Sequence, residues 1–203
     1  AGRHRDLVKR YRGTTDNTTR FKVAMSQLAN GQKKEASQSF RFVFRNTGSS
    51  KMRTQARVEL EKLEPACFSG KDYRLSCFKP DERLELAEAL FRNHKSTTVI
   101  TVLEPHLKSF KGLDKSSRCR ALFLLARSYD KLRNRKPGLR YYKRGRRLCR
   151  GEKIEPDFLY FGGVSAYRED QLRTALSSFR HLHNRWPKHS YNDDAVLYEA
   201  YSY

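Results

Sequence analysis

The stretch that decides the fold is ALFLLARSYDKLRNRKPGLRYY, residues 121–142. Its first half carries the apolar period of an amphipathic helix, with the spacing i, i+3, i+4 and i+7, at Leu122, Leu125, Ala126 and Tyr129. A polar turn follows, and Pro137 then indicates a new helix, because proline is favoured in the first turn of a helix. The stretch therefore predicts two helices joined by a short turn.

The same layout recurs along the chain: a small or aromatic residue late in one helix, a turn, and a small residue followed four positions later by an aromatic. Copies lie in residues 27–43 and 161–179, and a weaker copy runs through Leu86, Ala89, Thr98 and Val102. Gly138 and Ala175 are 37 residues apart, and the tetratricopeptide period is about 34 residues. Small residues let paired helices approach closely, and the aromatic fills the groove to the next pair. We therefore predict one all-α domain over residues 1–203, a tetratricopeptide-like α-solenoid of antiparallel helical hairpins.

Residues 96–103, STTVITVL, are the best candidate for a strand, because they are rich in β-branched side chains. A strand here would stand alone among helices, so we predict a helix instead. Pro105 predicts that this helix kinks or ends early.

The composition is strongly basic. The chain has 203 residues, with 43 Lys and Arg against 22 Asp and Glu, a formal net charge of +21 and a sequence pI of about 10.1. An aromatic content of 12% argues against disorder. No run approaches the roughly 20 apolar residues that a transmembrane helix needs, and the first residues carry no basic-then-apolar signal peptide.

Residues 190–203, SYNDDAVLYEAYSY, predict the first helix of a further hairpin. Asp193 and Asp194 lie in its first turn, where the helix dipole favours negative charge. The rest of the helix leaves little polar surface, so we expect either that the chain is a fragment of a longer one or that this end docks on a partner. The candidate docking residues are Val196, Tyr198 and Tyr201.

Two stretches, residues 121–144 and 174–200, carry a family pattern. The second contains Trp186-Pro187, and then a helix start of the form Ser-aromatic-x-Asp-Asp-Ala at residues 190–195. With the spacing between them, these stretches resemble the helical superhelix that precedes the catalytic domain in soluble lytic murein transglycosylases. The resemblance covers the chain from about Phe68 to Tyr203.

The resemblance implies a protein of the cell wall that is located in the periplasm. A cytoplasmic location is the alternative. In that family a separate lysozyme-like domain cleaves the glycan between N-acetylmuramic acid and N-acetylglucosamine, using one Glu as acid and then as base. That Glu stands in a Glu-Ser pair, followed by Gly-Leu-Met-Gln-like and Ala-Tyr-Asn-like motifs, and none of the three occurs in this sequence. The chain is therefore expected to be the non-catalytic scaffold, which needs no cofactor and positions peptidoglycan or an envelope protein near a catalytic domain.

The strongest local feature is a basic run, because residues 131–150 contain ten Lys or Arg and no acid. Arg140, Lys143, Arg144 and Arg147 have the spacing of one helical stripe. Like charges at this spacing cost a few tenths of a kcal/mol per pair, which suggests a use in docking a polyanion. A solvated face in a generally basic protein is the alternative. The candidate polyanion-binding residues are Arg133, Arg135, Lys136, Arg140, Lys143, Arg144, Arg147 and Arg150.

Two other functions stay open. The charge and the aromatics permit nucleic-acid binding, but the sequence holds no DNA- or RNA-binding motif, and its aromatics fall at helical packing positions. A standalone tetratricopeptide-like adaptor that binds a protein is the other alternative.

The cysteines are Cys67, Cys77, Cys119 and Cys149. No Cys-x-x-Cys and no zinc-spaced His is present, which argues against a metal site. In an antiparallel hairpin the start of the first helix lies beside the end of the second, so Cys119 and Cys149 could meet, while Cys67 and Cys77 flank a short loop. These candidate disulfides fit an oxidising envelope, and four buried thiols in a cytosolic protein are the alternative.

Overall fold

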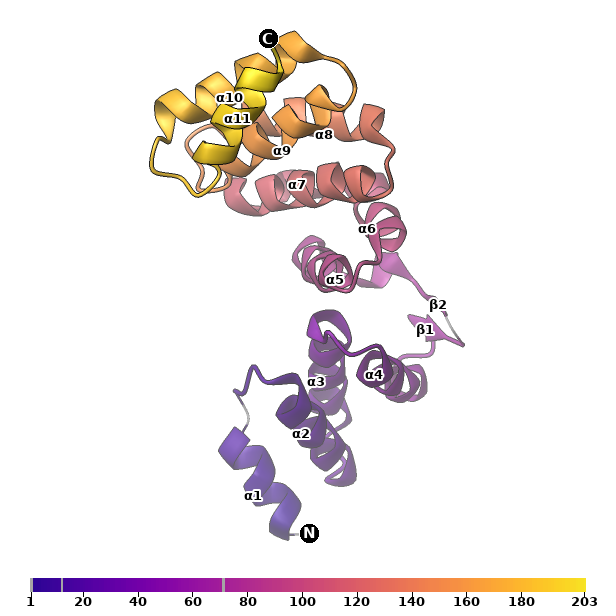
Figure 1. The fold of residues 1–203 in the computed structure, drawn as a ribbon. Helices are drawn as coiled ribbons and strands as arrows, with labels where there is room; N and C mark the ends of the chain where they lie inside the picture. The colour runs from indigo at the N-terminus through magenta and orange to yellow at the C-terminus, as the bar shows by residue number, and fades with distance from the viewer. Residues whose placement is uncertain (1, 12, 71) are drawn as a thin grey trace. The chain divides into compact units, whose positions relative to one another are not determined.

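The computed structural model describes residues 2–11, 13–70 and 72–203 (Figure 1). These residues form eleven α-helices that pair in consecutive antiparallel hairpins, together with short 3₁₀ turns and one hairpin of two-residue strands. The fold is therefore all-α and of the helical-repeat kind, as predicted. None of the described helices combines the length and the apolar character needed to cross a membrane.

The chain divides into two compact units, Ala1–His94 and Lys95–Tyr203. Each unit is described below by itself, so the single domain expected over residues 1–203 stays a prediction.

The first unit contains five helices and the small strand pair. Asp16 and Ser49 cap two of the helices, because their side chains accept hydrogen bonds from the backbone N–H groups of Thr19 and Met52. The elements are α1 (Gly2–Tyr11), α2 (Asn17–Ala29), α3 (Lys33–Asn46), α4 (Ser50–Leu63), β1 (Phe68–Ser69), β2 (Asp72–Tyr73), a 3₁₀ turn (Leu75–Cys77) and α5 (Pro80–Arg92).

The strand pair was not predicted, because two residues per strand are too few to show an alternating pattern. β1 and β2 are antiparallel, with Phe68 opposite Tyr73. A disulfide between Cys67 and Cys77 closes the loop that contains β1 and β2. Edge-to-face contacts of Phe44 with Phe68 and Tyr73 join the loop to α3, so an aromatic cluster anchors the strand pair.

The second unit contains six helices. The 96–103 segment is helical, as predicted, and it ends before Pro105, where a 3₁₀ turn takes over. The elements are α6 (Ser96–Leu103), 3₁₀ turns at Glu104–His106 and Ser109–Gly112, α7 (Lys115–Lys131), α8 (Arg135–Leu148), α9 (Glu155–Tyr167), α10 (Leu172–Arg185) and α11 (Asn192–Tyr201).

Glycine lets the helices of the second unit pack closely. A Cβ atom added at Gly145 of α8 would lie 1.9 Å from the ring of Phe158 on α9, and one at Gly163 of α9 would lie 2.6 Å from the ring of Phe179 on α10. Both phenylalanines are fully buried. Each ring therefore occupies the space that a side chain on the neighbouring helix would fill.

A disulfide between Cys119 and Cys149 joins the second turn of α7 to the C-cap of α8. Both residues are fully buried, within a cluster that also contains Tyr142 and Phe158. The covalent bond therefore holds the open end of the α7–α8 hairpin.

Replacing Gly145 by Ala should destabilise the protein by about 1–3 kcal/mol, the usual cost of overpacking a core. Denaturant unfolding measures this change. The control is Gly112→Ala, because no atom lies within 4 Å of the added Cβ at that position. Equal unfolding midpoints for the two variants would contradict the close approach.

Removing the Cys119–Cys149 bridge by a double substitution to Ala should lower the free energy of unfolding by about 2–4 kcal/mol, because the unfolded chain gains freedom. The measurement is denaturant unfolding without reductant. If the double variant matches wild type, the bridge does not form in solution.

Candidate anion-binding groove

The basic run folds as α8, which buries Gly138, Tyr142 and Gly145 against its neighbours. A Cβ added at Gly138 would lie 3.2 Å from the carbonyl oxygen of Ala126 on α7. With two glycines and Tyr142 turned inward, most of the long cationic side chains of α8 are left on its outer faces.

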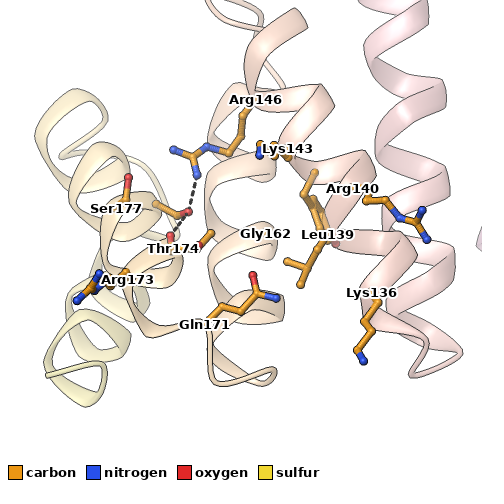
Figure 2. A pocket seen from close by; sticks show the side chains of 12 residues that line it. Lys136, Leu139, Arg140, Lys143, Arg146, Gly162, Gln171, Arg173, Thr174 and Ser177 are labelled. Atoms are coloured by element: carbon orange, nitrogen blue, oxygen red, sulfur yellow. Dashed lines mark hydrogen bonds between the residues drawn. The ribbon is translucent and has the colours of Figure 1, made fainter.

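A groove of about 540 Å³ lies between α8 and α10, with α9 beneath it (Figure 2). Cationic side chains stand beside polar and apolar ones in its walls, and none of the described residues that line it is Asp or Glu. The lining residues are Lys136, Leu139, Arg140, Tyr142, Lys143 and Arg146 from α8, Gly162 from α9, and Gln171, Arg173, Thr174, Ser177 and Ser178 from the start of α10.

The floor of the groove is a rigid contact. A Cβ added at Gly162 would lie 3.1 Å from the Cβ of Tyr142, so the two helices meet here with little space between them. The Tyr142 hydroxyl donates to Asp130 at 2.7 Å, and Ser165 donates to the other Asp130 oxygen at 2.8 Å. Burial and the Asp130 charge raise the pKa of Tyr142. The phenol therefore stays protonated and fixes the floor.

Arg146 connects the two walls. Its guanidinium donates to the Ser178 hydroxyl at 2.8 Å, and that hydroxyl donates to the Thr174 carbonyl oxygen at 2.8 Å (Figure 2). Burial lowers the pKa of Arg146, an effect that the Glu155 charge opposes. An arginine remains charged at neutral pH after such a shift, so α10 is held to α8 by a positive group.

The other cations of the groove lack an acidic partner. Among the described residues, no carboxylate oxygen lies within 4.0 Å of the charged nitrogens of Lys136, Arg140, Lys143 or Arg173. Nearby carboxylates would offset the positive charge of these four side chains. Because the described lining has none, the electrostatic potential in the groove is positive. The hydroxyls of Thr174 and Ser177 add neutral hydrogen-bonding groups. The arrangement suits an anionic ligand with polar substituents.

A second hollow of about 500 Å³ shares Lys143 and Arg146 with the groove. It differs in containing Glu155, whose side chain is only 3% exposed and lies 3.4 Å from Arg185. Glu155 also accepts a hydrogen bond from the backbone N–H of Gly151 at 2.7 Å. This neighbouring hollow is therefore partly neutralised, and the groove is the more positive of the two.

The predicted cationic stripe is divided by the structure. Arg140 and Lys143 line the groove, whereas Arg144 and Arg147 line a different pocket, described below. Arg147 also lines the second hollow, together with Arg150.

The two cations nearest the turn lie elsewhere. Arg133 is exposed in the turn before α8, with φ at 58°, and lines neither hollow. Arg135 lies 3.5 Å from Glu169, so its charge is compensated. Of the candidate residues, the groove brings together Lys136, Arg140 and Lys143.

Sequence reasoning missed the α10 side of the groove. Arg173, Thr174 and Ser177 lie outside the basic run, and nothing in their local sequence distinguishes them. The repeat itself was the available signal, because Gly138 and Ala175 were already aligned as equivalent positions in α8 and α10. Arg146 belonged to the run but not to the chosen stripe.

The remaining candidate residues are placed as follows. All four cysteines are in disulfides, as the pairs Cys67–Cys77 and Cys119–Cys149. On α11, Val196 and Tyr201 are 44% and 61% exposed, and Leu197, which we had not singled out, is 50% exposed. Tyr198 instead stacks on Phe179 at 5.5 Å between ring centroids. Its ring therefore belongs to the packing of the unit. Within the described part of the chain, no cluster of three His, Cys, Asp or Glu could hold a metal ion.

No known protein-family model matches the chain, and no curated protein sequence matches it. The groove is therefore interpreted from its own chemistry.

A carboxylate outside the lining of the groove holds two stacked tyrosines. Glu104 accepts hydrogen bonds from Tyr129 at 2.8 Å and from Tyr141 at 2.5 Å, and the two rings are stacked. Burial, followed by the Glu104 hydrogen bond, raises the pKa of Tyr129 from its ordinary 10.0 to about 12, partly opposed by Arg140. Because the raised pKa belongs to the folded state, this contribution to stability is complete below pH 10 and is lost as the pH rises through about 12.

Replacing Glu104 by Gln should therefore move the Tyr129 pKa down towards 10.0, because the carboxylate charge is gone. The measurement is the tyrosinate absorbance at about pH 10, with Tyr129→Phe in each background to assign the signal. Glu169→Gln is the control, since Glu169 pairs with Arg135 instead. A Tyr129 signal that is the same in wild type and Glu104→Gln would contradict this arrangement.

Proposed function

We propose that this protein is a non-catalytic helical-repeat scaffold of the cell envelope, which holds peptidoglycan through the groove between α8 and α10. The observation that carries the proposal is the set of cations in that groove without acidic partners, Lys136, Arg140, Lys143 and Arg173. The stem peptides of peptidoglycan carry carboxylates that would pair with these cations. The amides of the peptides and the sugars of the glycan strands would form hydrogen bonds with the hydroxyls of Thr174 and Ser177, which line the groove.

The disulfides support the location. Structural disulfides persist in oxidising compartments and are rare in the reducing cytosol. Both pairs, Cys67–Cys77 and Cys119–Cys149, stand in bonding geometry in the folded chain. The periplasm is the oxidising compartment that the transglycosylase resemblance implies.

The proposal assigns the chemistry to another part of the protein. In a lytic transglycosylase the cleaving Glu lies in a separate domain, and the scaffold keeps the substrate close to it. Binding with fast release suits that task, and open, partly hydrated cations provide modest affinity of this kind.

The decisive experiment compares two double variants of equal charge in co-sedimentation with purified peptidoglycan sacculi. The groove variant is Lys143→Gln with Arg173→Gln. The control is Lys153→Gln with Arg168→Gln, two exposed cations outside the groove. The groove variant should bind at least about fivefold more weakly, because it loses two charged hydrogen-bonding groups, and the control should bind like wild type.

Two results would overturn the proposal. Equal loss in both double variants would show that only the total charge matters. Tighter binding to mixed-sequence DNA or RNA than to sacculi, with a steep loss in salt, would favour the nucleic-acid alternative.

A second test concerns the compartment. Cells are treated with a thiol-blocking reagent before lysis, and the four cysteines are then mapped by mass spectrometry. We expect both pairs to be disulfide-bonded in the envelope fraction. Free thiols at Cys67, Cys77, Cys119 and Cys149 would contradict an envelope location.

A further inference from the structure

A further pocket lies between α8, α7 and the segment before α7. It is distinct from the groove and from the second hollow described above. It has a volume of about 420 Å³ and is formed by three segments of the second unit. The segment between α6 and α7 contributes Leu107, Phe110 and Lys111, α7 contributes Arg118, Ala121 and Leu122, and α8 contributes Arg144, Arg147 and Leu148.

The interior of this pocket is hydrocarbon. Phe110 and Leu122 are buried, and Leu107 and Leu148 are half-buried, so aliphatic and aromatic carbon lines the hollow. An apolar group that enters it leaves water, and this transfer favours binding.

Four cations surround this hydrocarbon, and no Asp or Glu lines the pocket. In the described part of the chain, no carboxylate lies within 4.0 Å of the charged nitrogens of Lys111, Arg118, Arg144 or Arg147. The Nε atom of Arg118 is also buried without a hydrogen-bond acceptor. That atom is closed off from the pocket, so an anion would contact the terminal guanidinium nitrogens of Arg118, whose side chain lines the pocket and is only partly buried.

Two of the three walls of the pocket, α7 and α8, are joined to each other before any ligand binds. Arg118 and Leu148 are the immediate sequence neighbours of Cys119 and Cys149, whose disulfide joins α7 to α8. The Lys115 ammonium also donates to the Arg150 carbonyl oxygen at 2.9 Å, across the same end of the hairpin. A preformed site loses less free energy on binding than one that must be ordered.

We propose that this pocket binds a single-chain amphiphile, with its aliphatic chain between Leu107, Leu122 and Leu148 and its anionic head group at Arg118. The head group is a carboxylate or a phosphate, since either oxyanion fits a guanidinium. The volume falls in the range of small-molecule sites, about 300–1,000 Å³. This inference does not depend on peptidoglycan binding, because the groove residues Lys143 and Arg173 do not line this pocket.

The test is calorimetry on the full chain with three probes that share a twelve-carbon chain: dodecanoate, dodecyl phosphate and dodecyltrimethylammonium, each below its micelle concentration. Saturable one-to-one binding of at least one anion, with no saturable binding of the cation, is the expected result. The anion that binds more tightly identifies the head group. Binding of all three with similar affinity, or of none, would overturn the proposal.

Variants locate the site. Arg118→Met keeps the length of the side chain and should weaken anion binding at least about tenfold, because one charged hydrogen-bonding group is lost. Arg118 is partly buried, so the exposed Lys111→Gln is the second variant, with a smaller loss expected. Arg168→Met is the matched control. Equal affinity in Arg118→Met, Lys111→Gln and the control would place the amphiphile elsewhere and overturn the assignment.

The same variants separate this inference from the proposed function. Arg118→Met should leave co-sedimentation with sacculi unchanged, and Lys143→Gln with Arg173→Gln should leave dodecanoate affinity unchanged. Loss of amphiphile binding in the groove variant would contradict a distinct pocket.

Discussion

The contact on which the second unit depends is the packing of an aromatic ring onto a glycine of the adjacent helix. Phe158 lies on Gly145, and Phe179 lies on Gly163. These contacts set the separation of α8, α9 and α10, and the width of the groove follows from that separation. The cations lie above this contact. Most of the cations of α8 take no part in its packing, because glycines and Tyr142 occupy the buried positions of this helix.

The sequence was sufficient for the fold class. The helical period of residues 121–142 and the prolines at helix starts predicted the hairpins, and the β-branched segment at 96–103 was correctly interpreted from its neighbours. The strand pair at Phe68 and Tyr73 could not be predicted from the sequence, because two residues per strand are too few to show alternating hydrophobicity. The division into two compact units depends on contacts between distant residues, which a period within single helices does not encode.

The candidate site was only half predictable. A run of positive charge is visible in sequence, so α8 was found, but a run does not show which side of the helix each cation faces. Arg135 was already compensated by Glu169, 34 positions away in the chain. Arg173 belongs to the groove only because α9 brings α10 beside α8. Charges that meet through tertiary structure have no signal in a local window.

The disulfide between Cys119 and Cys149 also determines how the second unit responds to mechanical force. When the two ends of the chain are pulled apart, tension passes directly from one sulfur atom to the other. The chain between the two cysteines, residues 120–148, includes α8 and most of α7 and carries none of that load. Roughly 100 Å of extended chain is thereby kept from unravelling, at about 3.3–3.6 Å per residue. Under such a load the second unit would stretch at its other hairpins first, while the basic helix α8 keeps its shape.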